Sequence, residues 1–175
     1  MKNNRKTIKS KFPEIVSYWE TKIYEGDIGT DWCDAETRCW RCGCENKLEK
    51  CHIIPHSLGG EDDPSNLILL CNRCHKEAPN STDSECMWEW IKATKVPFYD
   101  TFWAKRGLDE YEKTYNQNIC DHLKNVSVKK IKIATRKSFE NATVHYGVGN
   151  YNTSTLASVV KNIVKELEKT NTSAK

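Results

Sequence analysis

The sequence predicts an α+β fold, in which a small core held together by cysteines is flanked by mainly helical segments. Two Cys-x-x-Cys pairs mark the core, Cys39 with Cys42 and Cys71 with Cys74. Outside it, apolar residues recur at helical spacing, most clearly over residues 155–168. A chain of 175 residues has the length of one domain, or of a small core with extensions.

The N-terminal extension, residues 1–38, is predicted to be helical and basic. Pro13 suits the first position of a short helix over residues 13–24. The basic N-terminus is not followed by an apolar segment, so we expect no secretory signal. The longest apolar run, residues 67–71, has five residues, and the mean hydropathy is −0.73. These values exclude a membrane-spanning protein. The odd number of nine cysteines, many of them clustered, together with the lack of an export signal, favours a reduced chain in the cytoplasm.

The C-terminal extension, residues 81–175, is predicted to be mainly helical and packed on the core, residues 39–80. Thr82-Asp83-Ser84-Glu85 has the form of a capping box that starts a helix, which Pro97 ends. The expected elements that follow are a helix over 108–123 after Gly107, a strand over 126–134, a loop at Gly147 and Gly149, a helix over 155–168 and a frayed tail over 169–175. The apolar stripe of the last helix favours internal packing, although dimerisation through it stays open, so the chain is expected to be a monomer or a homodimer.

The two cysteine pairs predict a structural zinc site. A two-residue gap lets a tight turn direct both thiolates to one cation, and two such turns complete the tetrahedral sulfur set that zinc prefers. Between Cys42 and Cys71 lie 28 residues, more than in an ordinary four-cysteine ribbon, so this segment contains an insert. Cys44 is an alternative ligand to Cys42. Since thiolates fill all four positions, no site for water remains on this ion.

The insert and its C-terminal flank resemble the HNH nucleases, a branch of the ββα-metal endonucleases. The resemblance covers residues 39–78 and rests on the ribbon cysteines, His52-Ile53-Ile54-Pro55, Gly59-Gly60, Asn66-Leu67 and Cys74-His75, which occur in that order. It implies a hairpin followed by a short helix, and a cation-dependent endonuclease that leaves 5′-phosphate and 3′-hydroxyl ends.

The resemblance also implies roles for three residues. His52 is the general base that activates water, for which a neutral imidazole with a pKa of about 6.5 is suited at cellular pH. Asn66 orients this imidazole through backbone or side-chain bonding, and His75 ligates a catalytic Mg²⁺ or Mn²⁺ ion. Cys51 stands where the family has Asp or His as the second ligand. Three alternatives stay open: Cys51 ligates the catalytic ion, it is a bystander, or the ion is held by His75 and phosphate oxygens alone. A thiolate suits Mg²⁺ poorly, which weighs against direct ligation. His56 is an extra ligand or an exposed loop residue.

The expected partner is DNA, in double-stranded form. The acidic turn Glu61-Asp62-Asp63 is expected to be solvated and to face away from it. Basic residues that we expect to contact phosphates lie by the ribbon and metal helix and in a strand-like arm: Arg41, Arg73, Lys76, Lys129, Lys130 and Lys132. A second run, formed by Lys2, Arg5, Lys6, Lys9 and Lys11, is either a solvated face or a further contact.

Two functions are therefore compatible with the sequence. The first is a metal-dependent DNA endonuclease, a hydrolase of phosphodiester bonds. The alternative is a non-catalytic zinc-ribbon module that binds DNA and has lost turnover with the missing ligand at Cys51.

Overall fold

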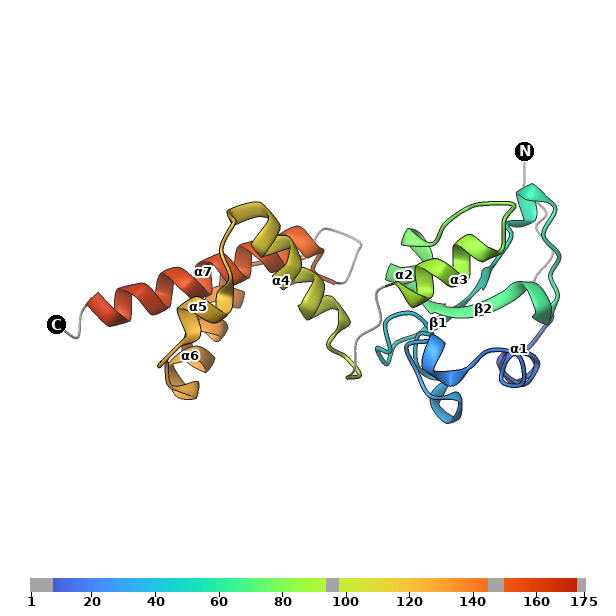
Figure 1. The fold of residues 1–175 in the computed structure, drawn as a ribbon, viewed down its shortest axis with the longest axis horizontal. Coiled ribbons are helices and arrows are strands. Elements are labelled where there is room, and N and C mark those ends of the chain that lie inside the picture. Colours follow the sequence, from blue (N-terminus) through green and yellow to red (C-terminus); the bar gives the residue numbers. More distant parts are fainter. Residues whose placement is uncertain (1–7, 94–97, 145–149, 173–175) are drawn as a thin grey trace. The chain divides into compact units, whose positions relative to one another are not determined.

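The computed structural model describes residues 8–93, 98–144 and 150–172. The chain divides into two compact units, residues 1–102 and 103–175, whose elements can be followed by colour in Figure 1. Helices and a two-stranded antiparallel sheet together confirm the predicted α+β class. The finer division at residues 38/39 and 80/81 stays a prediction. Among the described residues, no helix is both long enough and apolar enough to cross a membrane.

The first unit is built around a β-hairpin and the helix that follows it. Strands β1 (Leu48–His52) and β2 (Leu67–Cys71) pair so that Leu48 faces Cys71 and His52 faces Leu67. Every residue of β2 is buried. Helix α2 (Asn72–Glu77) begins directly after β2, so Cys74 and His75 follow the sheet without a loop.

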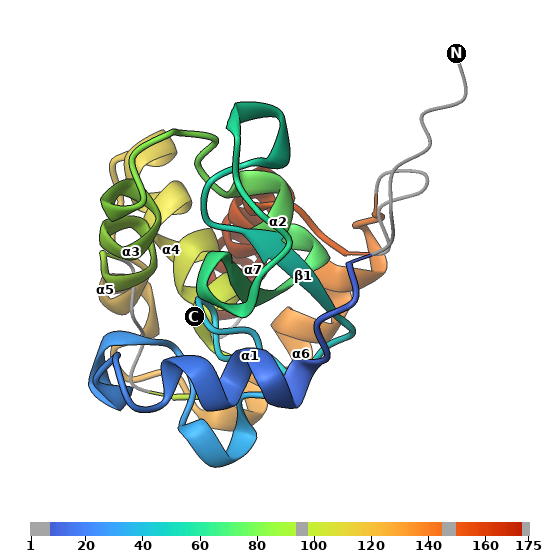
Figure 2. The ribbon, with the colours of Figure 1, turned by 90° about the vertical axis from the view of Figure 1, so that its right-hand side faces the viewer.

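Helix α1 (Phe12–Trp19) ends earlier than the predicted residue 24. The indole N–H of Trp19, the last residue of the helix, donates to the carbonyl oxygens of Pro64 (3.0 Å) and Leu67 (2.8 Å). This fixes the helix against the loop that enters β2, beside which α1 lies in Figure 2. Ile15 and Val16 are the buried residues of this helix.

Helix α3 (Glu85–Lys92) begins three residues after the predicted start at Thr82, and the predicted capping box does not form, because Ser84 is the N-cap and makes no side-chain cap bond. The Asp83 carboxylate accepts a hydrogen bond from the backbone N–H of Glu85 at 2.9 Å, which satisfies one of the free donors of the first turn. The buried residues Met87 and Ile91 lie one turn apart. The predicted stop at Pro97 lies outside the described residues.

In the second unit, the single predicted helix over 108–123 is two helices, α4 (Phe102–Tyr115) and α5 (Ile119–Leu123). The chain breaks at Asn116, whose φ is 51°, and the Asn118 side chain caps α5. Gly107 lies inside α4 instead of before it. A Cβ there would come within 2.6 Å of the Leu156 Cβ, so glycine allows α4 to approach the last helix closely.

The predicted strand over 126–134 is wrong: these residues begin helix α6 (Val128–Glu140). Ser127 caps the helix, because its hydroxyl accepts from the backbone N–H of Lys130 at 3.4 Å. Ala134 and Ser138, one turn apart, are the buried positions. The alternation Val-Lys-Lys-Ile-Lys-Ile matched a strand over a short window, whereas burial follows the helical period.

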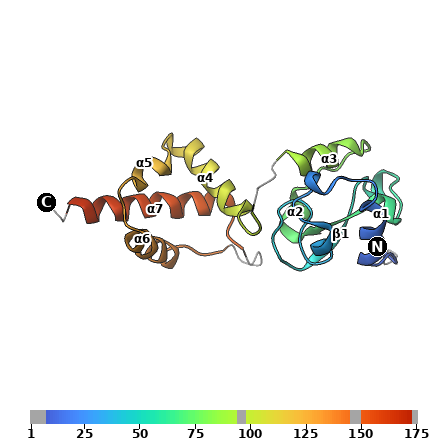
Figure 3. The same cartoon turned by 60° about the horizontal axis from the view of Figure 1, so that its bottom comes forward.

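Helix α7 (Thr153–Thr172) contains the predicted helix and extends into the expected tail. Figure 3 shows α4 and α5 on one side of α7 and α6 on the other. Its apolar stripe packs inside the unit: Val160 and Val164 against Tyr111, and Val159, Ile163 and Leu167 against Ala134. The loop predicted at Gly147 and Gly149 lies outside the described residues, as do residues 173–175.

Candidate active site and metal centre

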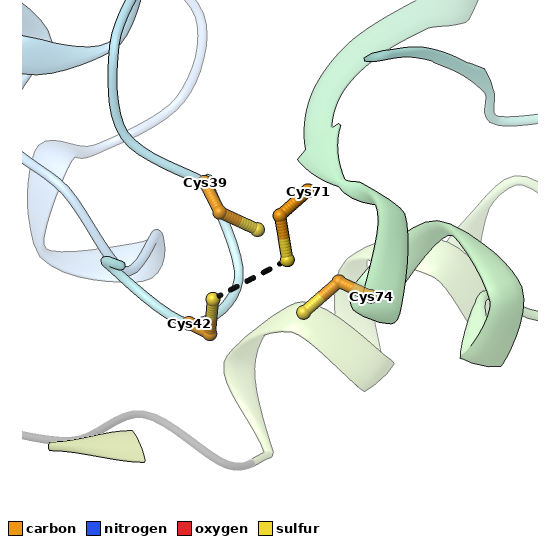
Figure 4. Close-up of side chains that lie close together, drawn as sticks. All are labelled: Cys39, Cys42, Cys71 and Cys74. Atoms are coloured by element: carbon orange, nitrogen blue, oxygen red, sulfur yellow. Dashed lines mark hydrogen bonds between the residues drawn. The ribbon is translucent and has the colours of Figure 1, made fainter. Parts of the chain in front are cut away.

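Four buried cysteines converge at the end of the hairpin. The Sγ atoms of Cys39, Cys42, Cys71 and Cys74 all lie within 4.8 Å of one another and point inward from two segments (Figure 4). The Cys42 and Cys71 sulfurs are 3.8 Å apart. A tetrahedral zinc with Zn–S bonds of about 2.3 Å separates its sulfurs by about 3.8 Å. The donor set and its spacing therefore fit a zinc ion.

Because the four cysteines are buried, their thiolate forms depend on a nearby cation. Burial raises the pKa of the Cys39 thiol well above its ordinary value. Four buried thiolates at this separation are unfavourable unless a cation neutralises them. Cys44, the alternative ligand, does not belong to this group among the described residues, and its Sγ lies 3.6 Å from the Cys42 carbonyl oxygen, to which it donates.

The local sequence explains how the turn around the first pair forms. The backbone N–H of Gly43 donates to the Cys39 carbonyl oxygen at 2.9 Å, and Gly43 has a φ of 64°. Its Cβ-free backbone also packs against the carbonyl oxygen of Gly29. On the other side, Cys71 ends β2 and Cys74 lies in the first turn of α2.

Arg41 supports this centre from inside the protein. Only 4% of the residue is exposed, and its Nη1 donates to the Glu77 carboxylate at 2.7 Å and lies 3.9 Å from the Cys74 Sγ. The guanidinium also stacks 3.8 Å from the Trp90 ring centroid. The predicted DNA contact of Arg41 is therefore wrong, because the residue is buried and bound within the protein.

Next to the cysteines, His52 and His75 line one cavity of about 400 Å³. His52 is the last residue of β1, and His75 lies on α2, so the hairpin and helix bring together two residues that are 23 positions apart. Glu49, Cys51, His56, Asn72 and Lys76 line the same cavity. His56 lines the cavity and is exposed, so both alternatives for it, an extra ligand or an exposed loop residue, stay predictions.

The His52 imidazole contacts a carboxylate that the sequence interpretation placed elsewhere. Its Nε2 is 2.7 Å from Oδ1 of Asp62. The expectation that the acidic turn is only solvated and faces away is therefore wrong for Asp62. No spacing rule indicates this contact, since it depends on how the loop after Gly59-Gly60 folds back.

His75 has a similar partner. Its Nδ1 is 2.7 Å from Oε2 of Glu49, and the Asn72 side-chain amide donates to the other oxygen of Glu49 at 3.0 Å. The Asn72 amide and then His75 hold the pKa of Glu49 below its usual value. Sequence analysis did not select Glu49, although its place two residues before Cys51 puts both on the same face of β1.

Asn66 holds the backbone that follows His52. Its Oδ1 accepts from the Ile54 N–H at 2.8 Å, and its Nδ2 donates to the carbonyl oxygens of Ile54 (2.9 Å) and Glu61 (3.0 Å). In the part of the chain that the structure describes, these side-chain bonds reach the loop and not the imidazole.

Cys51 is 3% exposed, and burial raises the pKa of its thiol to about 12. Its Sγ donates to the His52 carbonyl oxygen at 3.6 Å. A neutral, buried thiol is a poor ligand for a hard cation such as Mg²⁺.

The remaining predicted DNA contacts occupy different positions. Lys76 is exposed at the cavity, and Arg73 on the same helix is half-buried. Lys129, Lys130 and Lys132 are exposed on α6, in the second unit. Lys2, Arg5 and Lys6 lie outside the described residues.

Comparisons with known proteins agree with this geometry. Residues 38–81 match the model of the family described as HNH endonuclease. No curated protein and no solved structure matches the chain. The matched segment contains the hairpin, α2, both histidines and all four converging cysteines. Residues 38–81 of this chain are therefore a domain of the HNH endonuclease family, with four cysteines positioned to hold a metal ion.

Proposed function

We propose that this protein is a metal-dependent DNA endonuclease that hydrolyses phosphodiester bonds and leaves 5′-phosphate and 3′-hydroxyl ends. The observation that carries the proposal is that His52 and His75 line one cavity beside the cysteine cluster, within a segment that matches the HNH family. Phosphodiester hydrolysis needs both an activated water and a cation near the phosphate, and the cavity offers a group for each.

His52 acts as the general base. A neutral imidazole accepts the proton of a water molecule as that water attacks phosphorus. The position of His52 at the end of β1 fixes its backbone, while the bonds of Asn66 to Ile54 fix the chain that follows.

His75 holds the catalytic cation, Mg²⁺ or Mn²⁺, together with oxygen ligands from water and phosphate. When bound, this ion neutralises charge on the phosphate and on the leaving oxygen. The cavity fits such an ion because the His75 imidazole lines it and the Glu49 carboxylate, which contacts that imidazole, adds negative charge beside it. Cys51 is not included, since its side chain is buried and a thiol group suits Mg²⁺ poorly.

The zinc ion is structural in this proposal. Its four ligands join the turn at residues 39–42 to the end of β2 and the start of α2. Helix α2 carries His75, and β2 pairs with β1, the strand that ends at His52. Exposed lysines supply affinity for the DNA backbone by counterion release, with Lys76 at the cavity and Lys129, Lys130 and Lys132 on α6.

A plasmid-nicking assay tests the proposal. Wild-type protein should nick supercoiled plasmid only when Mg²⁺ or Mn²⁺ is present, and His52→Ala should lower the rate by about 10²–10⁴, the usual contribution of a general base. His122→Ala, which changes a histidine of α5 in the second unit, is the matched control and should keep the wild-type rate. DNA binding without cation-dependent nicking above the His52→Ala level would support the non-catalytic zinc-ribbon module instead.

A further inference from the structure

Two carboxylates outside the predicted set each contact one histidine of the cavity, and they do so at opposite ring nitrogens. Asp62 Oδ1 is 2.7 Å from Nε2 of His52, whereas Glu49 Oε2 is 2.7 Å from Nδ1 of His75. In the described part of the chain, all four groups belong to the first unit.

The chemistry of these contacts determines which nitrogen carries the proton. An ionised carboxylate has only lone pairs, so the imidazole nitrogen that faces it must be an N–H donor. A neutral imidazole has one N–H, and its second nitrogen then has a free lone pair. In its neutral form, His52 would therefore carry its proton at Nε2 and a lone pair at Nδ1, and neutral His75 would carry its proton at Nδ1 and a lone pair at Nε2.

We infer that Asp62 and Glu49 are positioning residues that hold the two histidines in opposite tautomers. Asp62 leaves Nδ1 of His52 to accept the proton of water, and Glu49 leaves Nε2 of His75 to ligate the cation. This inference rests on the proposed function for what the two free nitrogens do. It assigns Asp62 the contact to the imidazole that the sequence interpretation gave to Asn66.

Other bonds fix the place of each carboxylate. In the Asp62 loop, Asn66 binds the carbonyl oxygen of Glu61, and the Ser10 hydroxyl donates to the Asp62 carbonyl oxygen at 3.3 Å. Glu49 lies within β1, where it pairs with Leu70, and Asn72 donates to its second oxygen. Carboxylates that bind the second nitrogen of a ligating or catalytic histidine orient the ring in this way.

Long-range ¹H–¹⁵N correlation spectra of the zinc-loaded, ¹⁵N-histidine-labelled chain test the inference, with signals assigned by single His→Gln variants. At a pH where the imidazoles are neutral, wild-type His52 should show the Nε2–H tautomer and His75 the Nδ1–H tautomer. Asp62→Asn should disturb only the His52 pattern, because an amide donates as well as accepts, and Glu49→Gln should disturb only that of His75. Glu61→Gln, a charge change in the same loop, is the matched control. The reverse tautomers in wild type, or patterns that neither variant changes, would overturn the inference.

Activity gives a second readout. Asp62→Asn should lower kcat with little change in KM for DNA, whereas Glu49→Gln should weaken Mn²⁺ binding by about 10- to 100-fold. The spectra need no turnover. Wild-type protein with the expected tautomers but without nicking activity would therefore overturn the proposed function while supporting the positioning role, and active protein with other tautomers would do the opposite.

Discussion

Removal of zinc should unfold the first unit and leave the second folded. Structural zinc binding contributes about 10–16 kcal/mol in small zinc modules. The net stability of a whole domain is about 5–15 kcal/mol, so the rest of the first unit is not expected to compensate for the loss. The second unit contains none of the four ligands and has its own apolar clusters around α7.

The two units can be observed separately. Trp19, Trp32, Trp40, Trp88 and Trp90 lie in the first unit and Trp103 in the second, so tryptophan emission reports mainly on the first. Helices α4 to α7 have 14, 5, 13 and 20 residues, against 8, 6 and 8 in α1, α2 and α3. Far-ultraviolet circular dichroism should therefore keep roughly seven tenths of its helical signal while only the first unit unfolds.

Chelation under reducing conditions, followed by both signals and by metal analysis, makes the measurement. Cys71→Ser should behave like the chelated protein, and Cys33→Ser, which changes an exposed cysteine of the same unit, should behave like wild type. Zinc-free protein with native tryptophan emission would refute the structural role of the metal. Loss of the entire helical signal would refute the independence of the second unit.

Three substitutions test the packing around the site. Glu77→Gln should lower the free energy of unfolding of the first unit in urea by about 1–2 kcal/mol, because it leaves the buried Arg41 guanidinium without its carboxylate partner, which is itself partly exposed. The control Glu36→Gln, at an exposed site, should change this free energy little. Gly60→Ala would bring a Cβ into the carbonyl oxygen of Ile54 and should displace the Asp62 loop. Gly59→Ala meets no neighbour within 4 Å and should cost only the ~1 kcal/mol of a left-handed backbone, because the φ of Gly59 is 93°. A lower melting temperature for Gly59→Ala than for Gly60→Ala would contradict this. Asn66→Asp should cost about 2–4 kcal/mol by thermal unfolding, because a carboxylate cannot donate to the carbonyl oxygens of Ile54 and Glu61, and an unchanged melting temperature would count against the loop contacts.

The local features of the site could be predicted from the sequence. The convergence of the cysteines follows from two tight turns with fixed spacing, and the hairpin and α2 follow from the order of motifs between them. Helix α7 was predictable because its apolar stripe persists over several turns. In each case the signal is contained in a short, continuous segment.

Features that depend on tertiary contacts were not predictable. Over residues 126–134, short alternation resembled a strand, and only packing of Ala134 against α7 shows the helical period. Arg41 looked like a surface cation, yet the cysteine turn directs it inward to Glu77. The contacts of Asp62 with His52 and of Glu49 with His75 join residues from a loop, a strand and a helix, which no spacing rule relates.

The most direct test of the account is the count of bound metal ions in wild type and in His75→Ala. Elemental analysis should give one tightly held zinc per chain in both proteins, while Mn²⁺ titration followed by electron paramagnetic resonance should find a second, exchangeable ion in wild type alone. His122→Ala should bind this ion as wild type does. A wild-type chain without a second ion, or a His75→Ala chain that keeps it, would contradict the account.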